Sequence, residues 1–364
     1  GNSEIGNFPS RFLFGGVSYN QRPGIAPTQP GNNNLTWETS RQFDLGLEFG
    51  IAGNVIKGEI DYYTKNTDGL LFSVPLPGSS GAGSINQNIG VLESHGIELI
   101  LNSTNVSGQD FNWSTSFNMA TNINEIAELP NDNSDIISGR NINRTGNPVS
   151  SFYMPEYAGV DPANGDALYF VNGENTGDQT TNDIGEANRI IAGNPFPEFT
   201  AGITNDISYK GINLSFTFMG EWGASIYNAG GRFQSANADW FDNQTKDQLT
   251  RWQNPGDITR VPEARIGWGN GTGHSTRWLE KADFIRLRNV TLSYNLPQDV
   301  LKPIGFASAR VYLTGLNLLT ITDYMGYDPE SRSDSGGGAG ANNGQAFYSA
   351  PAPRTISVGI NVNF

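Results

Sequence analysis

The sequence is dominated by segments in which apolar residues occupy every second position. In the stretch QFDLGLEF, for example, Phe43, Leu45, Leu47 and Phe49 alternate with polar or small residues. Because successive side chains of a β-strand point to opposite faces, such a segment predicts a strand with one apolar and one polar face. Ten segments of this kind follow one another, at about 11–19, 38–50, 55–66, 90–103, 111–124, 197–209, 212–222, 283–295, 307–318 and 354–364.

The length of these segments favours a membrane-spanning barrel. Most contain 9–14 residues, whereas a strand of a globular protein has about five or six and a tilted strand that crosses a bilayer needs about 9–11. No run of 18 or more apolar residues is present, so no transmembrane helix is predicted. Alternation also explains why only 37% of the residues are hydrophobic, since a barrel needs an apolar outer face alone.

The connections between the segments alternate between long and short. An outer-membrane barrel has short periplasmic turns and long extracellular loops, so this alternation predicts that all long loops lie on one side of the membrane. In the segment 283–295 the apolar parity flips between Leu287 and Val290, which predicts a β-bulge or a passage above the bilayer rim. The short connections are 51–54, 104–110, 210–211 and 296–306, and the long ones are about 20–37, 67–89, 125–196, 223–282 and 319–353.

Aromatic residues gather near the predicted strand ends. Tyrosine and tryptophan prefer the membrane interface, where one part of the ring is buried and the other hydrated. The alternative is that these rings fill the core of a soluble β-sandwich. The residues are Trp37, Tyr62, Tyr63, Trp113, Tyr209, Trp222 and Tyr294.

Composition excludes several classes of function. Lysine plus arginine number 22 against 36 acidic residues, which gives a formal charge of −14 and argues against a nucleic-acid partner. There are no cysteines and only two histidines, so cysteine-based and multi-histidine metal sites are excluded. His95 and the adjacent Ser94 point to opposite faces of one strand and cannot form a catalytic pair. Glu59 and Asp61 share a face, but a charged lumen wall explains them better than a glycosidase site, so we predict no enzyme.

Several stretches together resemble the C-terminal barrel part of SusC/RagA-type TonB-dependent transporters of the outer membrane of Bacteroidetes-like bacteria. The resemblance covers nearly the whole chain, and the order and spacing of the stretches are more specific than any one of them. They include LTWETSRQFDLGLEF from Leu35, GEIDYYTKNTDGLL from Gly58, NIGVLESHGIEL from Asn88, GVDPANGDALY from Gly159, PEFTAGITNDISYKGINLSFTFMGEWGASIYN up to Asn228, FIRLRNVTLSYNLP from Phe284, VYLTGLNLLTITDYMGYDPE from Val311 and the terminal strand.

The resemblance implies an all-β fold, namely an antiparallel transmembrane β-barrel of which residues 1–364 are the C-terminal part. Such barrels have roughly 22 strands around a plug domain, so the chain would supply about the last ten. We expect it to be a fragment, because open sheet edges are not tolerated in lipid. The plug domain and the N-terminal strands are absent from this sequence, and Phe364 would be the C-terminal barrel-assembly signal.

The resemblance further implies TonB-dependent uptake of oligomeric nutrients, either glycans or peptides, with a SusD-like surface lipoprotein as partner. The TonB system would act through the missing N-terminal part, and outer-membrane lipid would surround the wall. No cofactor is expected. On the long loops we expect aromatic residues to bind substrate or partner, although they could instead pack the loop against its neighbours. These candidates are Trp240, Phe241, Trp252, Trp268 and Trp278.

We expect no metal site. Asp161, Asn164 and Asp166 offer oxygen ligands of the kind that calcium uses, but their spacing matches no EF-hand loop. The main alternative function is a soluble, secreted, β-rich glycan-binding module. Solubility without detergent, with gel mobility unchanged by boiling, would favour that alternative over the barrel.

Overall fold

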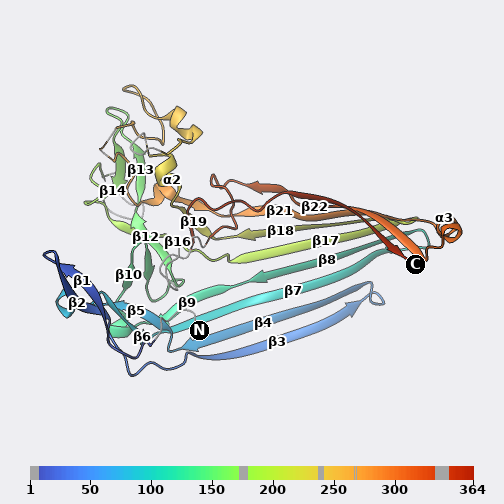
Figure 1. The fold of residues 1–364 in the computed structure, drawn as a ribbon, viewed down its shortest axis with the longest axis horizontal. Coiled ribbons are helices and arrows are strands. Elements are labelled where there is room, and N and C mark those ends of the chain that lie inside the picture. The colour runs from blue at the N-terminus through green and yellow to red at the C-terminus, as the bar shows by residue number, and fades with distance from the viewer. Residues whose placement is uncertain (1–7, 172–178, 237–241, 266, 268, 333–343) are drawn as a thin grey trace.

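The computed structural model describes residues 8–171, 179–236, 242–265, 267, 269–332 and 344–364. Its main feature is one large antiparallel sheet in which long strands lie side by side in chain order (Figure 1). These strands are β3 (Thr39–Ile51), β4 (Ile56–Asp68), β7 (Val91–Ser107), β8 (Phe111–Thr121), β17 (Phe199–Tyr209), β18 (Ile212–Trp222), β21 (Phe284–Asn295), β22 (Ser308–Thr322) and β24 (Thr355–Asn363). The short strand β9 (Ile123–Glu128) also pairs with β7.

The sheet confirms the predicted all-β, antiparallel architecture. Its long strands contain between 9 and 17 residues, which is enough to cross a bilayer at a tilt. Among the described residues β3 and β24 are the two edges of the sheet, and each pairs with one long strand only. The chain therefore forms a curved, open part of a wall.

One face of the sheet is apolar and uncovered. Leu292 on β21 lies opposite Leu214 on β18 and Leu313 on β22, and Leu313 in turn lies opposite Val358 on β24. Three of these side chains are 45% exposed or more, at Leu292, Leu313 and Val358. A soluble sandwich would cover such a face with a second sheet. No second sheet covers it in the described part of the chain, so the sandwich alternative is not the observed fold.

The opposite face is polar. Adjacent strands exchange hydroxyl hydrogen bonds there, between Thr291 and Thr314 at 3.1 Å and between Thr204 and Thr217 at 2.9 Å. A barrel wall has this two-sided character, with lipid outside and water inside.

The parity flip in β21 comes from a bulge, as predicted. Leu287 and Asn289 pair with the adjacent residues Phe218 and Thr217 of β18, so Arg288 is an extra residue in β21 relative to β18. Relative to β22, two residues, Asn317 and Leu318, lie opposite Arg288. The bulge returns Leu287 and Val290 to the same face of the sheet.

The prediction that 11–19 is a strand of the wall is wrong. This segment forms β1 (Leu13–Tyr19), which pairs with β2 (Arg22–Gln29) in a separate two-stranded hairpin. Asn20 and Gln21 join the strands with φ of 50° and 61°, as a two-residue turn of the primed type requires. This tight turn pairs the segment locally, and alternation alone does not distinguish a hairpin strand from a wall strand.

The remaining connections follow the predicted alternation. The turns between β3 and β4, β7 and β8, β17 and β18, and β21 and β22 are short and lie at one end, where the last one carries α3 (Gln298–Leu301) and η4 (Lys302–Ile304) (Figure 1). The long connections gather at the other end, and we call them the loop layer. We expect the loop layer to face the cell exterior.

The loop layer contains its own small strands and helical turns. They are β5 (Leu71–Pro75), η1 (Gly78–Ser80), β6 (Ser84–Asn88), α1 (Pro130–Asn133), β10 (Ile136–Ser138), β11 (Asn141–Asn143), β12 (Ser151–Pro155), β13 (Tyr157–Val160), β14 (Ala167–Phe170), β15 (Thr180–Thr181), β16 (Arg189–Gly193), β19 (Ser225–Asn228), α2 (Gly231–Gln234), η2 (Lys246–Thr250), η3 (Thr276–Trp278), β20 (Leu279–Lys281) and β23 (Gln345–Ala346). No helix of the described residues is long and apolar enough to span a membrane.

Several of the aromatic residues predicted for the membrane interface lie at the short-turn end of the sheet. We call this belt of rings the girdle. Phe111 and Tyr209 pair across strands with ring centroids 6.5 Å apart, and Trp113 and Tyr294 lie on the same apolar face. The girdle prediction is wrong for Tyr63. That residue lies on the polar face opposite Asp44, and its hydroxyl donates to Asn122 Oδ1 at 2.9 Å.

Candidate functional site

A cavity of about 840 Å³ lies within the loop layer. Its lining comes from three of the long connections, namely the segments between β12 and β16, between β18 and β21, and between β22 and β24. Segments that are more than a hundred residues apart in the sequence therefore meet at one site.

The cavity lining combines aromatic rings with charges of both signs. Tyr327 and Tyr348 contribute rings that are 59% and 41% exposed. Lys246, Lys281 and Asp323 also line it, and within the described residues these three side chains make no ion pair. Such a lining suits a ligand that offers both apolar groups and charges.

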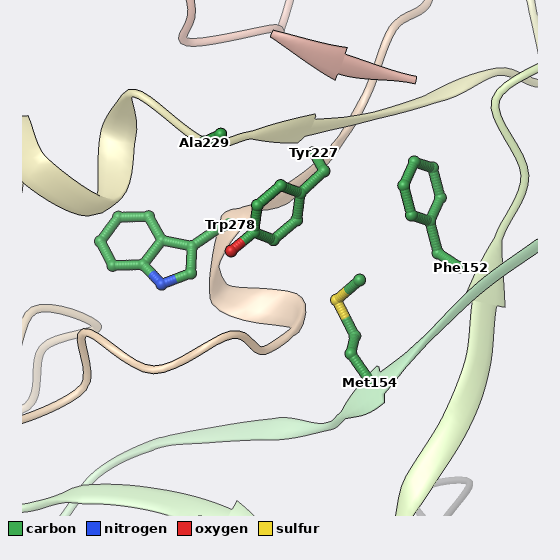
Figure 2. Close-up of a cluster of buried hydrophobic side chains, with 5 residues drawn as sticks. All are labelled: Phe152, Met154, Tyr227, Ala229 and Trp278. Atoms are coloured by element: carbon green, nitrogen blue, oxygen red, sulfur yellow. The ribbon is translucent and has the colours of Figure 1, made fainter. Parts of the chain in front are cut away.

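A buried cluster of apolar side chains borders the cavity and shares Trp278 with its lining. It consists of Phe152, Met154, Tyr227, Ala229 and Trp278, each 7% exposed or less. Figure 2 shows the ring of Tyr227 between the indole of Trp278 and the side chains of Phe152 and Met154. The cluster joins β12, β19 and η3, which fixes the position of three loop segments relative to one another.

Glu280 lies at the edge between this core and the cavity. Its carboxylate accepts hydrogen bonds from the backbone N–H of Met325 at 2.7 Å and from Asn228 Nδ2 at 3.2 Å. Burial raises the pKa of the Glu280 carboxyl, and these two hydrogen bonds partly offset the effect. Glu280 therefore ties the segment after β22 to the one after β18.

The imidazole of His274 has two hydrogen-bond partners. Arg232 Nη1 lies 3.1 Å from His274 Nε2, and the Tyr227 hydroxyl lies 2.6 Å from Nδ1. Because a guanidinium only donates, Nε2 must be the acceptor, and Nδ1–H then donates to Tyr227. Burial, together with the charges of Arg232, Arg140 and Arg189, lowers the pKa of His274 to about 4. The imidazole is therefore neutral near pH 7.

Two of the predicted aromatic site residues are buried. Trp278 is 5% exposed and its indole N–H donates to the Gly273 carbonyl at 3.0 Å, whereas Trp252 is 7% exposed and donates to the Pro162 carbonyl at 3.0 Å. Both rings pack loop segments together, as the packing alternative holds, although Trp278 also borders the cavity. A contact with substrate or partner stays a prediction for these two. Trp240, Phe241 and Trp268 lie outside the described residues.

Asp161, Asn164 and Asp166, the weak calcium candidates at which we expected no metal site, belong to the turn between β13 and β14. Asp161 Oδ1 accepts the N–H of Ala163 at 2.8 Å, and Asn164 Oδ1 accepts the N–H of Asp166 at 2.9 Å. Asp166 forms an ion pair with Arg265. Burial opposes ionisation of Asp166, but hydrogen bonds from Asn182 and Arg265 outweigh it and lower the pKa of the carboxyl. Among the described residues no group of three or more acidic or histidine side chains is placed to hold a metal ion.

Phe364 lies at the short-turn end of the sheet and is 91% exposed (Figure 1). Its ring packs edge-on against Phe306 at 5.5 Å. The barrel-assembly role stays a prediction, and an exposed terminal ring is compatible with it.

An ion-pair network in the loop layer was missed by the sequence analysis. Arg286 and Arg288 on β21 bind Asp328 and Glu330, which follow β22. Both groups lie within the stretches FIRLRN and YDPE that carry the family resemblance. Arginines in one motif and carboxylates in the other could have suggested ion pairs. The sequence does not show, however, that these two motifs lie close together in the fold.

A family model described as TonB-dependent receptor-like β-barrel matches residues 8–318. This chain belongs to that family. The structure agrees with this assignment, because its large antiparallel sheet has one apolar and one polar face, as the wall of a membrane barrel has.

Three relatives place this TonB-dependent receptor chain more closely. TonB-dependent receptor P3 of Formosa agariphila is 35% identical over 97% of the chain, and TonB-dependent receptor SusC of Bacteroides thetaiotaomicron is 29% identical over 99%. A solved structure of the RagAB peptide transporter covers the whole chain with a TM-score of 0.82 and 30% identity. The SusC/RagA-type resemblance is thereby confirmed.

The chain spans only part of these relatives. It covers 37% of receptor P3, 35% of SusC and 39% of the matched chain in the RagAB structure. The similar proteins are receptors and transporters rather than enzymes.

Proposed function

We propose that this chain is the C-terminal part of the barrel of an outer-membrane, TonB-dependent transporter that takes up oligomeric nutrients. The observation that carries the proposal is the position of the loop cavity. Its lining residues come from the long connections, which gather at one end of the sheet. A ligand held there would stand at the outer mouth of a water-filled passage.

The first substrate class to test is an oligopeptide, and the competing class is a glycan. A peptide offers backbone amides, apolar side chains and charges of both signs, which match the tyrosines, lysines and aspartate of the cavity. The likeness to a structure described as a peptide transporter supports the same choice. The likeness to SusC leaves the glycan alternative open.

The same proposal includes the parts of the transporter that this chain does not contain. Strands absent from this chain would pair with the edges β3 and β24 and close the barrel, since unpaired backbone is not tolerated in lipid. A plug domain would fill the lumen and connect it to TonB. A SusD-like lipoprotein would cover the loop layer, as the likeness to SusC and RagAB suggests.

The test is to purify the full-length protein from outer membranes in detergent and to identify the oligomers that co-purify by mass spectrometry. We expect peptides, released when the protein is denatured, and an uptake that stops when the TonB system is deleted. Recovery of saccharides alone would replace the peptide class by the glycan class. Recovery of the native protein in the soluble fraction, without heat-modifiable gel mobility, would overturn the transporter proposal.

A further inference from the structure

Residues 323–332, which we call the strap, follow the end of β22 and form one side of the loop cavity. Tyr324, Met325 and Tyr327 on the strap all line the cavity. Tyr324 is buried in a second cluster with Ala224 and Ile226, but Met325 and Tyr327 are 77% and 59% exposed. The side chain of Tyr324 is thus buried, whereas those of Met325 and Tyr327 are exposed to the cavity, with the Tyr327 hydroxyl accepting a hydrogen bond from Gln234 Nε2 at 2.8 Å.

Two arginines from β21 form ion pairs with the strap, and Arg332 of the strap pairs with Glu221 on β18. Arg286 Nη2 lies 2.6 Å from Asp328 Oδ1, and Arg288 Nη2 lies 2.5 Å from Glu330 Oε1. Arg286 also pairs with Glu330, so this carboxylate joins both guanidinium groups. These carboxylates come from the strap, and the arginines come from neighbouring positions on the wall.

Arg286 and Arg288 are two residues apart on β21, so both side chains can reach the same partner on the polar face of the sheet. Arg286 lies opposite Met219 on the polar face of the sheet. The bulged Arg288 contacts the sulfur of that same Met219 with Nε at 3.1 Å, and its Nη1 donates to Asn317 Oδ1 at 3.2 Å.

The pair between Arg286 and Asp328 is nearly fully buried. Their side chains are 3% and 4% exposed, respectively. Asp328 Oδ2 also accepts the backbone N–H of Ala352 at 2.9 Å, so the same carboxylate ties the approach to β24. A buried pair contributes little net stability, but removal of one partner leaves an uncompensated charge and is strongly disruptive. Such a pair specifies one position of the strap over others.

We propose that Arg286 and Arg288 are positioning residues of the loop cavity. Through Asp328 and Glu330 they hold the strap against the polar face of the wall, where it presents Met325 and Tyr327 to the ligand. The two arginines thereby determine how firmly the cavity retains an oligomer, although neither arginine contacts the oligomer. The part of this inference that concerns ligand retention rests on the function proposed above, whereas the anchoring of the strap does not.

The anchoring is tested by spin labelling of the full-length protein. This chain has no cysteine, so once any cysteine elsewhere in the full-length protein is replaced by serine, Met325→Cys gives a single nitroxide site on the strap, and Ile258→Cys gives a control site on another exposed loop. We expect Arg286→Met to increase the mobile fraction of the spectrum at 325 several-fold and to leave the label at 258 unchanged. Heat-modifiable gel mobility checks that the barrel still folds. An unchanged spectrum at 325 in a folded Arg286→Met protein would overturn the proposal.

Two further variants separate positioning from a general loss of structure. Arg286→Lys keeps the charge but loses the paired geometry of the guanidinium, so we expect a smaller increase in mobility than with Arg286→Met. The double variant Arg286→Met/Asp328→Asn removes the unpaired buried charge. It should therefore be no more mobile than Arg286→Met alone. A double variant with twice the effect would show that the two residues act independently and would contradict the proposal.

The consequence for binding is measured with a tryptic digest of casein as the probe. We expect Arg286→Met to retain about ten-fold less peptide per mole of folded protein than the parent, in line with the strong effect of breaking a buried pair. A mobile strap with unchanged retention would overturn the role in binding. If the parent protein retains no peptide, the peptide class of the proposed function fails, and the spin-label result still decides whether the arginines anchor the strap.

Discussion

The wall and the loop layer of this chain are stabilised in opposite ways. Long strands of the wall turn their apolar residues outward, where Leu45 is 64% and Val358 76% exposed. In the loop layer the apolar residues turn inward, and Ile142, Met154 and Ile226 are completely buried. The wall is therefore held together by backbone pairing and exposes an apolar face that suits lipid, whereas the loop layer carries its own small cores.

This difference has a consequence for function. A wall with fixed pairing is rigid and chemically uniform along each face. The loop layer combines short strands, buried clusters and ion pairs, so its shape depends on particular side chains. Recognition of a ligand belongs to the second kind of structure, as is usual for loops on a rigid scaffold.

The largest expected effect comes from the core of the loop layer. Phe152→Ala leaves a cavity beside Tyr227 and Met154, and we expect it to lower the local free energy of opening of the loop layer by about 3–5 kcal/mol. Hydrogen exchange of the backbone amides of Tyr227 and Trp278 measures this opening. Leu292→Ala in the wall is the matched control and should leave the exchange of these amides unchanged. Equal effects of both substitutions would remove the distinction between the two regions.

A charge on the wall should separate its two faces. Val290 lies on the apolar face opposite Phe216, and the next residue, Thr291, lies on the polar face. We expect Val290→Arg to destabilise the folded barrel by about 2–4 kcal/mol, because the charge enters the lipid, and Thr291→Arg to cost far less. Urea unfolding of the full-length protein in lipid vesicles provides the measurement. If both variants cost the same, the assignment of the lipid-facing side is incorrect.

The loop layer should lose stability in acid through His274. Burial and nearby arginines lower the pKa of His274 from 6.5 to about 4, so the unfolded segment binds a proton more readily than the folded one. The contribution of His274 to stability is therefore present above pH 6.5 and is lost as the pH falls towards 4. Hydrogen exchange of the loop layer should rise over this range, and His274→Gln should flatten the rise. A steep response that persists in His274→Gln would assign it to another group.

The smallest expected effect concerns a polar contact on the apolar face. Trp113 Nε1 and Thr115 Oγ1 both donate to Asn205 Oδ1, at 2.9 and 2.8 Å. Trp113→Phe keeps the ring but removes one hydrogen bond, so we expect a loss of about 1 kcal/mol in vesicle unfolding. A loss as large as that of Val290→Arg would mean that the wall, like the loop layer, depends on single side chains.

Much of the wall was predictable because the direction of the side chains in a strand repeats every two residues. Alternation located the long strands, and the parity flip at Leu287 and Val290 located the bulge. The same rule failed for 11–19, because the turn at Asn20 and Gln21 folds this segment into a hairpin of its own. Period two identifies a strand, but it does not identify the partner.

The site was predicted less well than the wall. The long loops were identified as the functional part, and Trp278 does border the cavity, but the sequence could not show that Trp252 and Trp278 are buried. The strap and its arginines were also not foreseen. These features depend on contacts between segments far apart in the chain, which no local pattern encodes.

The sequence by itself determined the strands, their two faces and the end at which the long loops gather, because backbone geometry converts residue parity directly into direction. Only the tertiary structure decided which loop residues are buried, how Arg286 meets Asp328 and where the cavity lies. The physical reason is that pairing in a meander is local, between neighbours in the chain, whereas packing in the loop layer joins connections that only the folded wall brings together.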